Sequence, residues 1–170
     1  MWPAEHQVAR IQYKGISTNI DTDLEAGEAD GEVSEVHEQW STFDKIPGNE
    51  QKDIRIYKNF FVKRYKDPDI ATNEEKMQKK AAFVKVKLHK SADEEYSYLF
   101  QTLLQDPESL DQFIKKINNI DEMTNIIDQL LVAVERLDDN KIQHCDLHAI
   151  DNILVSQNNI KIVDFENARD

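Results

Sequence analysis

The sequence predicts an α+β fold in two parts, a small strand-rich lobe followed by a helical lobe. Short runs of β-branched and aromatic residues, interrupted by one helical segment, occupy residues 39–104. Helical periodicity dominates the first part of residues 105–170, and a short hairpin pattern follows it. Strands and helices are therefore segregated along the chain, which is typical of the α+β class.

Residues 1–38 differ from the rest of the chain. From Asp21 to Glu38 the sequence is rich in acidic residues and contains few large apolar ones. Such segments bury too little apolar surface to offset the entropy lost on folding. We therefore predict a disordered acidic arm over residues 1–38.

Two strands and a turn are expected at the start of the first lobe. The strands are Ser41–Ile46 and Asp53–Tyr57, and the turn is Pro47-Gly48-Asn49. A third strand follows Asn59 over Phe60–Tyr65, where aromatic and β-branched residues are concentrated.

A helix is predicted over residues 72–82. Thr72 and Glu75 have the spacing of a capping box, with Thr72 as the N-cap residue. Glu74 falls on the apolar face of this helix. Two further strands, Phe83–Leu88 and Tyr96–Leu104, complete the lobe.

The second lobe is predicted to contain two helices, Leu110–Ile117 and Glu122–Leu137. The longer helix has apolar residues at the i, i+3, i+4, i+7 spacing of a single stripe. Two short strands, Ile153–Val155 and Ile160–Val163, follow as a hairpin. The apolar stripe consists of Met123, Ile126, Ile127, Leu130, Leu131, Val134 and Leu137.

The net charge of −12 over 170 residues limits the expected partners. Nucleic acids and anionic membranes select basic surfaces, so binding to either is not expected. A local basic patch remains in the cluster of lysines between residues 76 and 90. Cys145 is the single cysteine, which excludes an internal disulfide and favours a reducing compartment. No run approaches the roughly 20 apolar residues of a membrane helix, so we expect a cytoplasmic protein, or one delivered into a host cytosol.

Residues that can bind a metal or transfer a proton are concentrated in one polar loop of the sequence. His, Asp, His, Asp and Asn occur between His144 and Asn152, and the hairpin after them ends in Asp164-Phe165-Glu166. The hairpin should return Asp164 to the neighbourhood of Asp146 and Asn152. Oxygen ligands of this kind suit Mg²⁺, which usually shares them with substrate phosphates. A separate carboxylate near the metal can orient or deprotonate an attacking hydroxyl.

This segment resembles the catalytic loop and metal-binding motif of the protein-kinase-like superfamily, H-x-D-L-x-x-x-N followed by D-F-G. Asp146 and Asp164 are 18 positions apart, close to the separation usual in that superfamily. His148 and the Asp-Phe-Glu sequence are similar to haspin-like, aminoglycoside-kinase and choline-kinase members. The resemblance implies a two-lobed kinase fold, with a partial helical C-lobe because only four residues follow Glu166.

The resemblance also implies roles for the loop residues. Asp146 would position or deprotonate the acceptor hydroxyl, and His148 would lie near the γ-phosphate. Asn152 and Asp164 would bind Mg²⁺. The loop has one residue more than the family pattern, so Asp151 is the alternative to Asn152 as metal ligand.

The nucleotide would be held from the first lobe. Phe61-Val62-Lys63 resembles the family's V-A-I-K strand, so Lys63 would bind the phosphates of ATP. Its carboxylate partner would be Glu74 or Glu75. Gly48 alone stands where the family has a glycine-rich phosphate loop.

The function expected from the resemblance is an ATP- and Mg²⁺-dependent kinase that phosphorylates a hydroxyl, with protein serine or threonine favoured. A small-molecule kinase of the aminoglycoside or choline type is one alternative. A non-catalytic mimic that binds a kinase or its partner is another, as is a fragment of a longer kinase gene. In each case the apolar stripe of residues 122–137 would need cover from a partner protein or a second copy of the chain.

Overall fold

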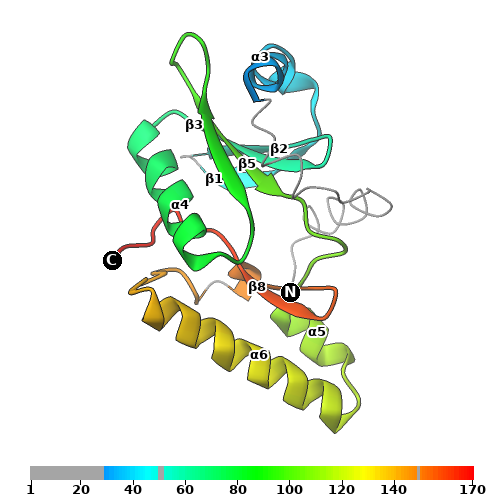
Figure 1. Ribbon diagram of the computed structural model, residues 1–170. Helices are drawn as coiled ribbons and strands as arrows, with labels where there is room; N and C mark the ends of the chain where they lie inside the picture. Colours follow the sequence, from blue (N-terminus) through cyan, green and yellow to red (C-terminus); the bar gives the residue numbers. More distant parts are fainter. Residues whose placement is uncertain (1–28, 50–51, 149) are drawn as a thin grey trace.

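A five-stranded antiparallel sheet forms the upper lobe of the computed structural model, which describes residues 29–49, 52–148 and 150–170 (Figure 1). Its strand order is β1-β2-β3-β5-β4. The central strands β3 and β5 are rich in aromatic and β-branched residues and are buried along most of their length. The strands are β1 Lys45–Asn49, β2 Lys52–Tyr57, β3 Phe60–Tyr65, β4 Val86–Lys90 and β5 Ser97–Thr102.

Helix α3, Ala29–Gln39, packs against this sheet and leads into the short helix η1, Trp40–Thr42. Val33, Val36 and Trp40 are buried in the same core cluster as the sheet residues. The prediction of a disordered arm is therefore wrong for residues 29–38, and residues 1–28 lie outside the described part of the chain. The i, i+3, i+7 spacing of these three apolar residues gives the helix one buried face, although acidic residues surround them.

Helix α4, Pro68–Ala81, begins earlier than the capping-box pattern predicted. Asp67 is the N-cap residue, and its carboxylate accepts a hydrogen bond from the Asp69 amide at 2.9 Å. Pro68 supplies a fixed φ at a position where its missing N–H costs nothing. Thr72 lies inside the helix, where its hydroxyl donates to the Pro68 carbonyl at 2.8 Å. The predicted N-cap at Thr72 is therefore wrong.

The turn predicted at Pro47-Gly48-Asn49 is instead part of β1. Ile46 pairs with Ile54 and Asn49 with Lys52, so the register shifts between these two pairs. Proline lacks an N–H donor and glycine lacks a side chain, and both are tolerated at such an irregularity in an edge strand, which pairs with only one neighbouring strand. The connection to β2 falls at residues 50–51, which lie outside the described residues.

The lower lobe contains α5, Leu110–Lys116, and α6, Ile120–Asp139, which confirm the two predicted helices (Figure 1). A three-stranded sheet packs on them in the order β6-β7-β8. The predicted hairpin is present, with Gln157 and Asn158 at φ 51° and 61° in its turn. Helix η2, Ile150–Asn152, joins the polar loop to β7. The strands are β6 Glu108–Ser109, β7 Ile153–Ser156 and β8 Asn159–Ile162.

Helix α6 is amphipathic, but only part of its predicted apolar stripe is buried. Ile126 and Leu137 are buried against the lower sheet, together with Ala133. Ile127 and Leu131 are 49% and 58% exposed. Among the described residues, no helix has both the length and the apolar character needed to cross a membrane.

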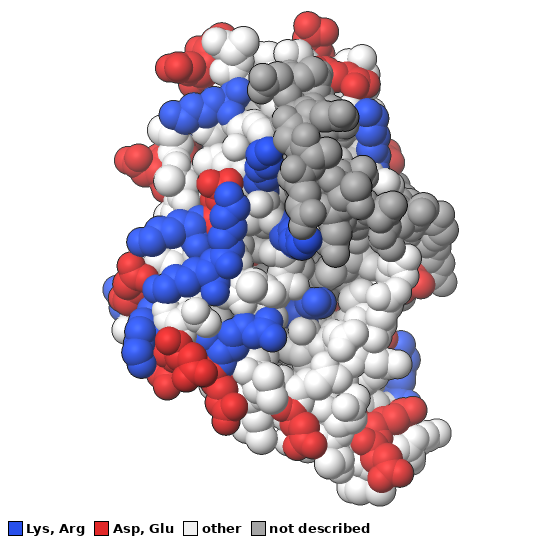
Figure 2. Space-filling model, in the orientation of Figure 1, with Lys and Arg blue, Asp and Glu red and all other residues white. Residues whose placement is uncertain are grey.

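Charged side chains are distributed unevenly over the surface. Lysine and arginine side chains gather on the side of the molecule where α4 lies, in the view of Figure 2. Two lysines of the predicted basic patch, Lys76 and Lys80, form ion pairs with the Asp170 carboxylate at 3.1 Å and 2.7 Å. A third, Lys79, pairs with Glu75 at 3.2 Å. Neighbouring acids thus partly neutralise this patch.

Candidate active site

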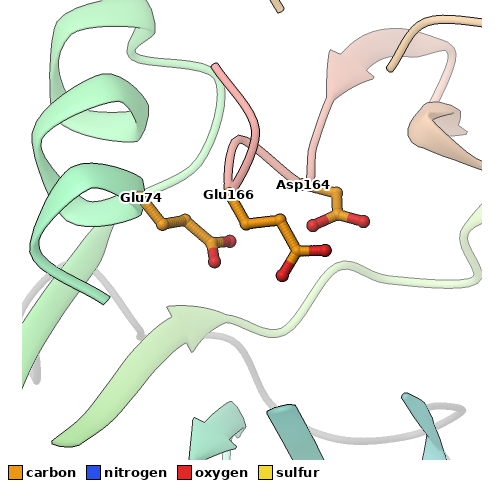
Figure 3. Close-up of side chains that lie close together, drawn as sticks. All are labelled: Glu74, Asp164 and Glu166. Carbon is orange, nitrogen blue, oxygen red and sulfur yellow. The ribbon is translucent and has the colours of Figure 1, made fainter. Parts of the chain in front are cut away.

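Side chains from β3, α4 and the segment after β8 converge between the two lobes. Lys63 of β3 and Glu74 of α4 form a buried ion pair, with the Lys63 ammonium donating to the Glu74 carboxylate. The Lys63 Nζ also lies 3.9 Å from Oδ1 of Asp164. Figure 3 shows the carboxylates of Glu74, Glu166 and Asp164 side by side. The two predicted residues Lys63 and Asp164 are therefore brought together.

Glu74, and not Glu75, is the partner of Lys63. The Glu74 carboxylate is fully buried and also accepts hydrogen bonds from the Tyr65 hydroxyl and, at 3.0 Å, from Nε2 of Gln78. Glu75 instead accepts from the Leu88 amide at 2.5 Å, on the β4 side of the helix. The two glutamates lie on different sides of α4, and only Glu74 faces Lys63.

Lys52, at the start of β2, is a member of this cluster that the sequence prediction missed. Its Nζ lies 2.6 Å from Oδ1 of Asp164 and 3.2 Å from Oε2 of Glu166. In the β2–β3 register, Lys52 faces Tyr65 and Ile54 faces Lys63. Residues two apart on a strand project from the same face, so this alternation is the sequence signal that could have identified Lys52.

The charges in the cluster perturb one another strongly. Burial alone lowers the pKa of the Lys63 ammonium, but the carboxylates of Glu74 and Asp164 outweigh burial and raise its pKa above the ordinary value. Burial alone raises the pKa of Asp164, but the ammonium groups of Lys63 and Lys52 hold it below the ordinary value. Both residues are therefore charged at neutral pH.

The polar loop places Asp146 next to Asn152. The Asn152 amide Nδ2 donates to the backbone carbonyl of Asp146 at 3.0 Å and to its Oδ2 at 3.2 Å. His148 is largely exposed, and its Nε2 lies 3.4 Å from Oδ1 of Asp146. Asp151 lies in η2, one residue before the Asn152 that contacts Asp146. The inserted residue of the loop thus leaves Asn152 against Asp146.

Hydrogen bonds through His144 connect the polar loop to the segment that carries Asp164. The Nε2 of His144 donates to the Val163 carbonyl at 2.8 Å, and its Nδ1 accepts from the Asp146 amide at 3.2 Å. The His144 ring also packs edge-on against Phe165, with 4.7 Å between ring centroids. Cys145 and Asp164 adopt positive φ values of 68° and 65°, which turn the backbone sharply at both segments. The loop and the Asp164 segment therefore form one unit.

The chain after Asp164 is anchored to both lobes. The Asn73 side chain of α4 donates to the Ala168 carbonyl at 2.8 Å. Gln143 and Arg169 exchange two backbone hydrogen bonds, of 2.8 Å and 2.9 Å, just before the polar loop. Residues 165–170 thus connect α4 to the base of the loop.

The donor set suits a hard divalent cation. One carboxylate oxygen from each of Glu74, Asp164 and Glu166 lies within 4.8 Å of the others, and Mg²⁺ prefers oxygen ligands. Asn152 donates through its amide nitrogen, so its amide oxygen is the atom that could serve a metal. Gly48 lies in the irregular part of β1, and the loop beyond it falls at residues 50–51, outside the described residues.

The sequence profile of the family described as "Protein kinase domain" matches residues 41–170. No curated protein matches the chain. The matched region runs from η1 to the end of the chain and contains the Lys63–Glu74 pair, the polar loop and Asp164. With a match over most of its length and a strand-rich lobe joined to a helical one, the chain belongs to the protein kinase domain family.

Proposed function

We propose that the protein is an ATP-dependent phosphotransferase that moves the γ-phosphoryl group of ATP to a hydroxyl. The observation that supports this most directly is the buried Lys63–Glu74 ion pair beside Asp164. A lysine held by a carboxylate and facing a second carboxylate is suited to bind a metal–phosphate complex. A structural ion pair alone would not require the third charge at this place.

Each residue has a defined part in this proposal. Lys63 holds the phosphates, and Glu74 keeps the ammonium in place. Asp164 and Asn152 hold Mg²⁺, which would neutralise the negative charge of the phosphates during transfer. Asp146 orients the acceptor hydroxyl and accepts its proton, and the exposed His148 contributes a hydrogen-bond donor near the transferred group.

We propose a serine or threonine side chain of a protein as the acceptor, because the match is to the protein kinase domain family. A small alcohol of the aminoglycoside or choline type is the alternative acceptor. Incubation of the enzyme with labelled ATP and either a protein mixture or a panel of amino alcohols distinguishes the two.

The test of the proposal is phosphoryl transfer from labelled ATP by wild type and by Asp146→Asn. We expect the variant to lose transfer by a factor of about 10² to 10⁴, because the group that accepts the proton is gone. Its thermal midpoint should stay close to that of wild type, since the amide has the same shape. Asp139→Asn, which makes the same change at an exposed carboxyl at the end of α6, is the control and should remain active. Wild-type rates in Asp146→Asn would exclude the proposed role.

A second candidate function is a non-catalytic kinase mimic that binds a kinase partner. The observation that favours it is the ion pair between the Lys52 ammonium and Asp164, because it occupies a carboxylate that is a candidate metal ligand. A thermal shift assay with Mg²⁺-ATP separates the two functions. Stabilisation that grows with ligand concentration supports the phosphotransferase, whereas an unchanged midpoint at millimolar Mg²⁺-ATP supports the mimic.

A further inference from the structure

Lys52 has no part in the catalytic roles assigned so far, yet its side chain is buried in the site. It is 7% exposed, and its ammonium contacts Asp164 and Glu166 across the two lobes. Lys63 approaches the same Oδ1 of Asp164, at 3.9 Å. Two ammonium groups therefore converge on one carboxylate oxygen.

The register of the sheet shows why the two lysines converge. Lys52 lies two residues before Ile54, and Ile54 pairs directly with Lys63. Both lysines project from one face of the sheet, about 7 Å apart along the strand direction. Lys52 is also the first residue of β2.

The charge balance of the cluster changes when a divalent cation binds. Mg²⁺ at Asp164 would place two positive charges beside the Lys52 ammonium, which then loses its closest carboxylate oxygen. The Lys52 ammonium would keep its ion pair with Glu166, at 3.2 Å, but the added positive charge of the metal would repel it. A further anion at this place is therefore favoured, because a poorly compensated buried charge is costly. The phosphates that accompany Mg²⁺ supply that anion at the same place.

Gly48 is the single glycine between residues 45 and 57. A glycine-rich phosphate loop relies on several glycines, which let backbone amides approach the phosphates closely. A lysine side chain supplies positive charge without requiring that approach.

We propose that Lys52 is a second phosphate-binding lysine of the nucleotide site. In this state it is held by Asp164 and Glu166, and it transfers to a phosphate oxygen when a metal-bound nucleoside triphosphate or diphosphate enters. The inference rests on the proposed function, because it requires that the site binds a nucleotide.

The experiment measures the affinities of ATP and adenosine, with Mg²⁺, for wild type, Lys52→Met and Lys52→Arg. Lys52→Met should weaken ATP binding by at least about 10-fold, the effect of a lost charge-assisted hydrogen bond. Adenosine binding should change by less than about 2-fold, because adenosine has no phosphate for Lys52 to contact. Lys52→Arg should recover part of the ATP affinity. Lys66→Met, which removes one exposed lysine charge at the end of β3, is the matched control and should bind both ligands as wild type does.

The outcomes separate the inference from the proposed function. ATP affinity unchanged in Lys52→Met, or an equal loss for ATP and adenosine, overturns the inference and assigns Lys52 a purely structural role. Absence of ATP and adenosine binding by wild type overturns the proposed function and the inference with it. Normal ATP binding by wild type together with a selective loss in Lys52→Met supports both.

A measurement on the wild-type chain covers the case in which Lys52→Met does not fold. An acyl phosphate of ATP transfers its acyl group to a lysine amine beside the phosphates; the new amide bond forms as the acyl–oxygen bond breaks, and ATP leaves. Peptide mass spectrometry should find the label on both Lys52 and Lys63, competed by excess ATP, and not on Lys66. Label on Lys63 without Lys52 would contradict the inference.

Discussion

Glu74 is the residue on which the order of the site most depends. Its buried carboxylate accepts from Lys63, Tyr65 and Gln78, so one side chain joins β3 to α4. Removing a single partner from such a network leaves the others buried without their acceptor, which costs more than the pair contributes in the intact protein. The free energy of unfolding and the nucleotide affinity should therefore both respond to this residue.

We expect Glu74→Ala to lower the free energy of unfolding by about 3–5 kcal/mol, because the buried Lys63 ammonium and Tyr65 hydroxyl lose their acceptor. Glu75→Ala, one residue along the same helix, should cost about 1–1.5 kcal/mol, the value of one hydrogen bond and one partly exposed ion pair. Urea denaturation of the two variants measures the difference. Equal destabilisation would contradict the assignment of Glu74 as the partner of Lys63.

Asp53 should control the stability of the upper lobe at acid pH. Burial alone raises its pKa, but the hydrogen bonds from Nε1 of Trp40, at 2.9 Å, and from Arg55 outweigh burial and lower its pKa below 3.8. A group with a lowered pKa stabilises the fold above its unfolded pKa and loses that contribution as the pH falls through its folded pKa.

The contribution of Asp53 to the free energy of unfolding should therefore be constant above about pH 5. It should decrease once the pH drops below 3.8, the ordinary pKa of the aspartate in the unfolded chain. Asp53→Asn should be less stable than wild type at pH 6, and the difference should shrink as the pH approaches 3. Thermal midpoints measured from pH 6 to pH 3 test this. A constant difference over that range would show that the ionisation of Asp53 makes no contribution.

At the scale of single elements, local patterns predicted most helices and strands but not all of their ends. The α6 and hairpin predictions are confirmed because strong periodicity and turn residues act locally. The start of α4 could not be chosen from local pattern alone, since Asp67-Pro68 and Thr72 both carry N-terminal signals. Helix α3 was missed because its burial depends on the distant sheet, and Lys52 was missed because its partner Asp164 is 112 residues away.

The position of the α4 N-cap gives a direct test. Asp67→Ala should lower the free energy of unfolding by about 1 kcal/mol, because the first turn loses its side-chain acceptor. Thr72→Ala should lie within about 0.5 kcal/mol of wild type, since its hydroxyl is exposed and bonds only within the helix. Chemical denaturation of both variants compares them. A larger loss of stability in Thr72→Ala than in Asp67→Ala would contradict Asp67 as the N-cap residue and support the predicted capping box at Thr72.

At the scale of the whole molecule, α6 leaves apolar surface uncovered. The sequence pattern predicted one stripe of seven residues, but the small sheet β6-β7-β8 covers only the side that carries Ile126, Ala133 and Leu137. Ile127, Leu131 and Val134 remain about half exposed. Periodicity identifies which residues are apolar on a helix, but the width of the surface opposite decides how many are buried.

Leu131→Lys should therefore reduce binding of the apolar dye 8-anilinonaphthalene-1-sulfonate and the protein's tendency to associate. Leu131 is 58% exposed, so its replacement removes apolar surface at little cost in stability. Asn125→Lys, at an exposed position of the same helix about 120° away from Leu131 around the axis, introduces a lysine outside the apolar patch and is the control. Light scattering over a concentration series measures association, and identical behaviour of the two variants would show that charge alone is responsible.

The Asn73 hydrogen bond to the Ala168 carbonyl has a mechanical consequence. Asn73 immediately precedes Glu74 on α4, and Arg169 immediately follows Ala168 and is paired with Gln143 at the base of the polar loop. A displacement of α4 that separated Glu74 from Lys63 would therefore either break this hydrogen bond or move Ala168 and Arg169, and with them Gln143 at the start of the polar loop. A ligand that shifted α4 would therefore also shift the start of the polar loop, and the reverse would hold as well.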